Sequence, residues 1–167
     1  MGARYTLGSV SVTLTAVANA ANFTDNGYPF FLQGGSSTML LRIHEVASGG
    51  ESAAPAVAIM IFGRDSTVAA TGISGCTNAA DDASTTAPGT LPVFGRVSTT
   101  KPQASATLGN LIHHSYNAYG GGSKFQARQG EEISLIGNTA SLGELSYRAF
   151  TGSAAGQISA HCKYEVA

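Results

Sequence analysis

Charged side chains are scarce in this chain of 167 residues. Asp, Glu, Lys and Arg make up 11% of the residues and leave a net charge of −1, whereas soluble domains carry about 25%. The nine Lys and Arg residues are scattered and form no basic stripe, which binding to a nucleic acid requires. We therefore expect no nucleic acid partner. Because charge keeps free surfaces apart, its scarcity favours a protein whose surface is covered by neighbours.

Features typical of several other protein classes are also missing. The chain has no Trp, and its two cysteines, Cys76 and Cys162, have no metal-ligand spacing. No stretch approaches the roughly 18 apolar residues of a membrane span, and the N-terminus lacks the continuous apolar block of a signal peptide. We expect two reduced thiols, no membrane partner, and synthesis in the cytoplasm without export by the usual route.

The sequence offers no clear constellation for catalysis. Nucleophilic catalysis needs a nucleophile, a base and an orienting acid that converge, and no motif here supplies them. The adjacent His113 and His114 would point to opposite faces of a strand. A site that combines one of them with His44 and His161 is one alternative, and histidines spread over a sheet surface are the other. We predict no catalytic residue, no metal ligand and no cofactor.

Period-two alternation is what the sequence does contain. Val10, Val12 and Leu14 alternate with Ser and Thr, which predicts a strand with these three residues on one face. The segment 57–62 is apolar on both faces and predicts a central strand. The final segment predicts a strand that places five residues on one face: Ile158, Ala160, Cys162, Tyr164 and Val166.

These patterns predict one all-β domain over residues 1–167. About eight or nine short strands separated by Gly-rich turns are typical of an antiparallel β-sandwich or jelly roll. No window combines sustained helical periodicity with helix caps. We therefore expect at least seven strands and no helix longer than two or three turns.

The tract from about residue 65 to 110 differs from the rest of the chain. It is rich in Ala, Thr, Ser and Gly, so it has too little apolar area to offset the ordering of roughly 45 residues at 1–2 kcal/mol each. It also lacks the charge of a solvated tail. We expect an extended loop or arm that lies across a neighbouring subunit. The candidate partner contacts are Arg64, Leu91, Val93, Phe94 and Arg96.

The layout of the chain resembles the decoration or cement proteins of tailed-bacteriophage heads. The pieces that carry the resemblance are Arg4-Tyr5-Thr6, the strand 40–45, Ile61-Phe62-Gly63-Arg64, the turn 130–132 and the closing Tyr164-Glu165. The longer 65–110 tract and the His113-His114 pair depart from plainer members. The resemblance implies an all-β virion structural protein on the outer capsid surface. It also implies a homo-oligomer, trimer or dimer, bound to a major capsid protein.

Two other function classes stay open at this point. One is a carbohydrate- or receptor-binding β-sandwich module, for which Tyr116 and Tyr119 beside a Gly triplet would form an aromatic platform. The other is a β-sandwich hydrolase, which would need a deep pocket that holds His with Asp or Glu. We predict a non-catalytic assembly protein ahead of both.

Overall fold

The computed structural model describes residues 2–13, 15–16, 30–64, 76–85, 90, 92–95, 110–139, 144–151 and 156–167. Within these ranges the regular elements are strands, and none is a helix. The strands are β1 (Ala3–Thr13), β2 (Thr15–Ala16), β3 (Phe30–Gln33), β4 (Leu40–Gly50), β5 (Val57–Arg64), β6 (Thr77–Ala80), β7 (Val93–Gly95), β8 (Asn110–Asn117), β9 (Gly122–Gln126), β10 (Ile133–Ile136), β11 (Glu144–Thr151) and β12 (Gln157–Val166). The described residues contain no helix long and apolar enough to cross a bilayer.

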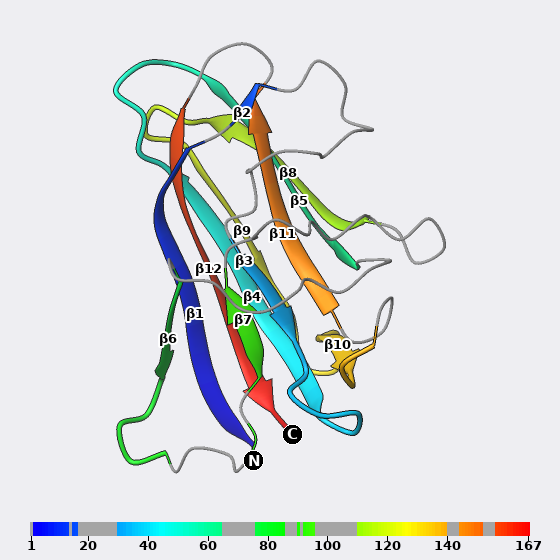
Figure 1. The fold of residues 1–167 in the computed structure, drawn as a ribbon. Helices are drawn as coiled ribbons and strands as arrows, with labels where there is room; N and C mark the ends of the chain where they lie inside the picture. The colour runs from blue at the N-terminus through cyan, green and yellow to red at the C-terminus, as the bar shows by residue number, and fades with distance from the viewer. Residues whose placement is uncertain are drawn as a thin grey trace.

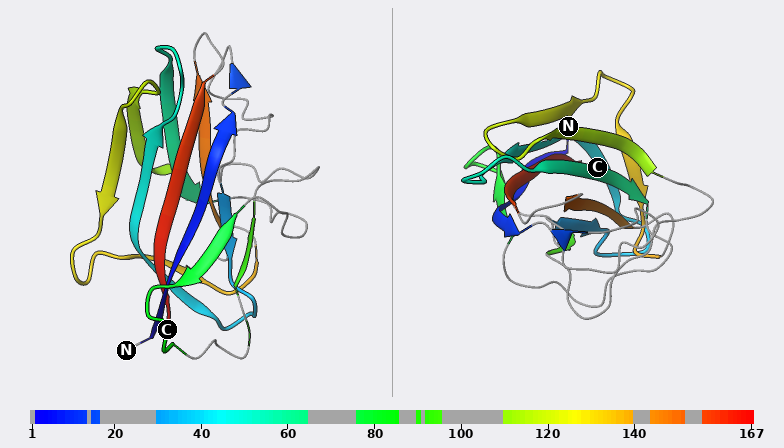
Figure 2. Two further views of the ribbon diagram at one scale, coloured as in Figure 1. Left: turned by 90° about the vertical axis from the view of Figure 1, so that its left-hand side faces the viewer. Right: turned by 90° about the horizontal axis from the view of Figure 1, so that it is seen from above.

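The strands form two six-stranded sheets that pack face to face (Figures 1 and 2). Sheet A has the order β10-β4-β12-β1-β6, and β9 also pairs with β4. Sheet B has the order β7-β3-β11-β5-β8, and β2 also pairs with β11. That last pairing is parallel and the others are antiparallel. The predicted all-β antiparallel sandwich is therefore confirmed.

The core lies between the inner faces of the two sheets. Its largest fully buried side chains include Tyr164 from sheet A and Phe30, Phe62 and Tyr147 from sheet B. The Phe30 and Tyr147 rings lie 5.4 Å apart at an interplanar angle of 48°, a tilted contact that aromatic rings favour. The β5 strand pairs with both β8 and β11, which confirms the prediction that the segment 57–62 is a central strand.

The last strand follows its predicted alternation. Ile158, Ala160, Cys162 and Tyr164 are buried and Val166 packs against the core, while the residues between them face outward. The β12 strand is central, with β1 on one side and β4 on the other. Ala3 of β1 pairs with Val166, so both chain ends lie at the same end of the sandwich (Figure 1).

The prediction for β1 is wrong at Val10. Val12 is buried, but Val10 is 70% exposed and Ser9 is buried instead. The register steps from Ser9–Ala160 to Val12–Ile158, so β1 carries one extra residue, a β-bulge. Ser11 has a φ of 53° there, and the alternation changes phase. Leu14, which was predicted to share a strand face with Val10 and Val12, lies outside the described residues.

A second bulge shifts the phase of β4. Glu45 pairs with Lys163 and Ile43 pairs with Tyr164, which leaves His44 as the extra residue. Ile43 and Val46 therefore both point into the core, whereas His44 and Glu45 both face outward. A bulge re-aims side chains in this way, and here it places two ionisable groups side by side on the outer face of sheet A.

The described parts of the 65–110 tract pair with strands of the same chain. The β6 strand pairs with Tyr5–Gly8 of β1 at the edge of sheet A. The β7 strand pairs with Phe31–Gln33 of β3 at the edge of sheet B. Residues 65–75, 86–89, 91 and 96–109 lie outside the described part of the chain. The contact of this tract with a neighbouring subunit therefore stays a prediction.

Candidate functional site

The outer face of sheet A carries two carboxylates that are largely buried. Glu45 of β4 is 8% exposed and Glu165 of β12 is 7% exposed. Burying a carboxylate is costly unless it is paired, so the partners of these two groups define the site. The chain has few charges, and a cluster of them on one sheet face is the most distinctive chemical feature of the described residues.

Glu45 is held from the two strands that flank β4. The His161 Nε2 atom of β12 lies 2.8 Å from Glu45 Oε1. The Lys124 ammonium of β9 lies 2.7 Å from Glu45 Oε2. Burial would raise the pKa of Glu45, but the hydrogen bonds and charges of Lys124 and His161 outweigh it and lower the pKa below its usual range. Glu45 is therefore an ionised link across three strands.

Glu165 has a similar arrangement at the end of the sheet that holds both termini. It accepts a hydrogen bond of 2.7 Å from the Gly2 backbone N–H. Its other oxygen lies 3.2 Å from His44 Nε2 and 3.7 Å from Arg4 Nε. Burial would raise the pKa of Glu165, and these groups together lower it. The two glutamates thus each anchor a histidine on the neighbouring strand.

A broad groove of about 1010 Å³ runs over this charged region. Both glutamates line it, together with Arg4, Arg42 and Lys163. The carboxylates are already engaged by their own neighbours, whereas the Arg4 side chain is 52% exposed and the Lys163 side chain is 45% exposed. The groove can therefore form ion pairs with a polar partner surface, and its buried part serves to hold the strands together.

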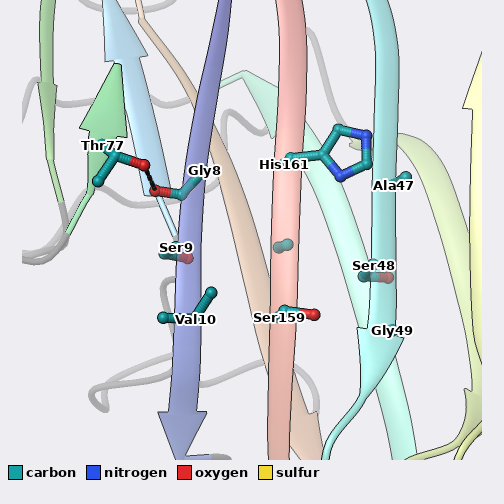
Figure 3. A pocket seen from close by; sticks show the side chains of 10 residues that line it. Gly8, Ser9, Val10, Ala47, Ser48, Gly49, Thr77, Ser159 and His161 are labelled. Atoms are coloured by element: carbon teal, nitrogen blue, oxygen red, sulfur yellow. Dashed lines mark hydrogen bonds between the residues drawn. The ribbon is translucent and has the colours of Figure 1, made fainter. Parts of the chain in front are cut away.

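A second hollow adjoins His161 on the same face (Figure 3). Its volume is about 390 Å³, and small residues from three strands form its floor, among them Gly8, Ala47 and Ser159. Thr77 Oγ1 at its rim donates a hydrogen bond of 3.4 Å to the Gly8 carbonyl. Apart from Val10 and His161, the hollow is lined by small residues, so this part of the face lets another surface approach the backbone closely.

The histidines do not converge on one site. His44 and His161 lie on the outer face of sheet A, whereas His114 lies on the inner side of sheet B with Nδ1 3.3 Å from Tyr147 Oη. His113 is exposed on the opposite face of β8, as the alternation predicted. Among the described residues no three His, Cys, Asp or Glu side chains gather to hold a metal ion. The predicted alternative of a combined histidine site is not formed.

Three of the five predicted partner contacts fall in the described part of the chain. Val93 and Phe94 lie together on β7 and are partly buried, and Phe94 packs against the core. Arg64 is also partly buried, and its Nη2 donates a hydrogen bond of 2.7 Å to the Ser134 carbonyl of β10, which ties sheet B to sheet A. Burial lowers the pKa of Arg64. The other two, Leu91 and Arg96, lie outside the described residues.

Sequence reasoning missed the two glutamates. The available signal was a His and a Glu in each of two strongly patterned segments, His44-Glu45 and 161–165. The partners are separated by 116 positions for Glu45 and His161 and by 121 for His44 and Glu165. Local patterns give no access to pairings of that range.

Comparison with known proteins gives little guidance. No family model matches the chain, and no curated protein matches it. Among solved structures, a chain of "Structure of deformed wing virus carrying the GFP gene" aligns with 12% identity over 98% of this chain and 67% of that chain, with a TM-score of 0.24. This virus structure is a remote neighbour, and a similarity of that size supports no conclusion about fold or function.

Proposed function

We propose that this chain is a non-catalytic structural protein that works by assembly, as a decoration or cement protein on the outer surface of a tailed-phage capsid. The resemblance in layout points to this class, and the distribution of charged and apolar side chains supports it. On this proposal the protein is part of the virion and is made in the host cytoplasm.

The observation that carries the proposal is that β8 has no charged residue and has an exposed apolar side chain near each of its ends. Val57 is 51% exposed, Leu111 is 40% exposed and Tyr119 is 59% exposed. No residue of β8 is charged, whereas the outer face of sheet A carries the charged cluster around Glu45 and Glu165. Because burying an unpaired charge is costly, a strand without charged residues suits burial against a neighbour.

The physical role follows from binding that is selective for the assembled shell. A ligand that binds the closed lattice and not its free subunits stabilises the lattice by mass action. Oligomers of the chain, dimers or trimers, would gain further from effective concentration when several copies engage one particle. The partners on this proposal are copies of the chain and a major capsid protein. The role uses surface contacts and needs no catalytic group.

Co-sedimentation tests the proposal. Purified chain is mixed with capsids of the encoding virus that lack it, and with the unassembled major capsid protein. We expect the chain to pellet with capsids and to raise the temperature at which they release their genome. A Leu111→Lys/Val57→Lys variant should bind more weakly, whereas Ile136→Lys, at an exposed apolar residue of β10 in sheet A, is the control. Wild-type chain that stays in the supernatant would contradict the proposal.

A carbohydrate- or receptor-binding module is the second candidate. A hollow of about 300 Å³ lies at the end of β5 and β8, lined in part by Tyr116 and Asn117. Tyr119 is exposed just beyond it. However, Tyr116 is half-buried and its hydroxyl is inaccessible to solvent, which leaves less of its ring for stacking on a sugar. Binding to a glycan array that Tyr119→Ala abolishes would favour this candidate.

A further inference from the structure

We propose that the outer edge of β8 pairs antiparallel with β8 of a second copy of the chain, so that two B sheets become continuous across a two-fold axis. This inference rests on the proposed function as an assembly protein and specifies one of its contacts. It is drawn from the edges of the two sheets, from the direction of the backbone groups of β8, and from the shape of the surface beside it.

The β8 strand is the longest edge without the usual protection among the described strands. Natural sheets protect their edges with short strands, charged residues, proline or bulges. The edge strands β6, β7 and β10 have only four, three and four residues, and β9 has five and carries Lys124. In contrast, β8 has eight residues without Asp, Glu, Lys, Arg or Pro. Its one irregularity lies near Leu111, and its pairing with β5 is regular from Ile112 onward.

The free backbone groups of β8 can be assigned to individual residues. The Ala118 N–H donates a hydrogen bond of 2.7 Å to the Ala56 carbonyl at the end of the β5–β8 ladder. In an antiparallel pair, successive residues turn their N–H and C=O groups alternately toward and away from the partner. His113, Ser115 and Asn117 therefore turn these groups away from β5, toward the free edge. His113 and Ser115 thus offer both a donor and an acceptor to an incoming strand, whereas the Asn117 carbonyl already accepts a hydrogen bond of 2.8 Å from the Gly121 N–H.

The surface beside this edge is complementary to itself. Leu111 is 40% exposed at one end of the outer face of β8, and the hollow lined by Val57, Ser115 and Asn117 lies at the other end. Leu111 is the extra residue of the irregularity in β8, because Phe62 pairs with Ile112 and Gly63 pairs with Asn110. A two-fold axis at His114 therefore brings the Leu111 end of each strand near the Asn117 end of the other. Each Leu111 then lies against the other copy's hollow, an isologous contact in which the same patch serves both subunits.

Charge and area indicate a weak and reversible contact. Because β8 carries no charged residue, two copies bring no like charges together along the strand. Pairing one short strand from each copy buries less than the roughly 1,000 Å² of a stable interface. The contact therefore contributes mainly when several copies are held on one particle, where effective concentration strengthens weak links.

Sedimentation of a proline variant tests the pairing. Ser115→Pro removes an N–H that faces the free edge, and proline is tolerated at such positions of an edge strand. Ser115→Thr keeps the N–H and is the matched control. We expect wild type and Ser115→Thr to show a reversible monomer–dimer equilibrium in analytical ultracentrifugation, and Ser115→Pro to associate at least tenfold more weakly. A wild type that stays monomeric at its highest soluble concentration, or a folded Ser115→Pro variant that dimerises normally, overturns the inference.

Cross-linking tests the register of the β8 pairing. It also tests the pairing itself if the Ser115→Pro variant fails to fold. With the axis at His114, residue 113 of one copy lies opposite residue 115 of the other, at a Cα separation of about 5.5 Å that suits a disulfide. In a Cys76→Ser background, a mixture of His113→Cys and Ser115→Cys chains should form mixed dimers with oxidised glutathione, and each variant alone should form far fewer. Equal yields from the single variants, or no mixed dimer, overturn the register.

The two proposals fail in different experiments. A chain that is monomeric in the ultracentrifuge but pellets with capsids overturns the β8 pairing and leaves the proposed function in place. A chain that dimerises through β8 but does not pellet with capsids overturns the proposed function and leaves the β8 pairing in place.

Discussion

The hydroxyl groups of Ser48 and Tyr147 lie 2.8 Å apart inside the core and join the two sheets. Ser48 comes from β4 of sheet A and Tyr147 from β11 of sheet B. His114 Nδ1 of β8 lies 3.3 Å from the same Tyr147 oxygen. Burial raises the pKa of Tyr147, so its hydroxyl stays protonated and can donate one hydrogen bond while it accepts the other. A polar bridge thus crosses the interior between the two sheets.

Removing the tyrosine hydroxyl should destabilise the fold. Tyr147→Phe leaves the buried Ser48 hydroxyl without this partner, and an unsatisfied buried polar group costs about 1–3 kcal/mol. The free energy of unfolding from urea titration measures this loss. Replacing both partners removes the unsatisfied serine hydroxyl, and the loss of the His114 contact is common to Tyr147→Phe and the double variant. Tyr147→Phe/Ser48→Ala should therefore cost less than the sum of the two single variants. Strict additivity would show that the two hydroxyls are not coupled.

Acid should weaken the sandwich through Glu45 and Glu165. Both have pKa values in the folded state below 4.5, so the unfolded state takes up protons first as the pH falls. Their contribution to stability is complete above about pH 4.5 and is lost as the pH falls through the lower folded-state values. Thermal melting at a series of pH values measures this slope.

Replacing Glu45 with Gln should separate its contribution from general charge effects. Glu45→Gln should be less stable than wild type near neutral pH. It should also lose less stability on acidification, because residue 45 no longer has a carboxylate that takes up a proton on unfolding. Glu131→Gln makes the same change in net charge at an exposed residue and is the control. An acid slope for Glu45→Gln as steep as that of wild type would contradict the role of Glu45.

The bulge in β1 predicts opposite results at two neighbouring valines. Val12 is fully buried and Val10 is 70% exposed. Val12→Ala should therefore cost about 2 kcal/mol through lost burial and a cavity, whereas Val10→Ala should stay within about 0.5 kcal/mol of wild type. Urea denaturation of the two variants side by side gives the comparison. Equal costs would mean that both valines face the core, as a regular alternation requires.

Single-residue deletions test the bulge in β4. Deleting His44 removes the extra residue, so Ile43 and Val46 keep their inward orientation and the main loss is the contact with Glu165. We expect a folded protein that is destabilised by about 2 kcal/mol. Deleting Val46 should instead prevent folding, because it shifts every later side chain of β4 to the other face. Circular dichroism with thermal melting distinguishes these outcomes, and a Val46 deletion as stable as the His44 deletion would contradict the assignment.

Local pattern was enough for much of the fold. The alternation from Ile158 to Tyr164 predicted which side chains of the last strand face the core, because side-chain direction in a strand has a fixed period of two. The continuous apolar run 57–62 predicted a central strand. The same rule predicted that His113 and His114 face opposite sides. It failed at Val10, because a bulge adds one residue and nothing in a Val, Ser and Thr run marks where it occurs.

The sequence by itself determined that this chain is all-β, sparsely charged, and built from strands with one buried face. Only the tertiary structure decided which strands pair, that Glu45 meets His161 and Glu165 meets His44, and that β8 is left as an edge. The reason is physical. Strand formation depends on neighbouring residues, whereas these contacts join positions more than a hundred residues apart, and their geometry is set by sheet register and by single-residue bulges.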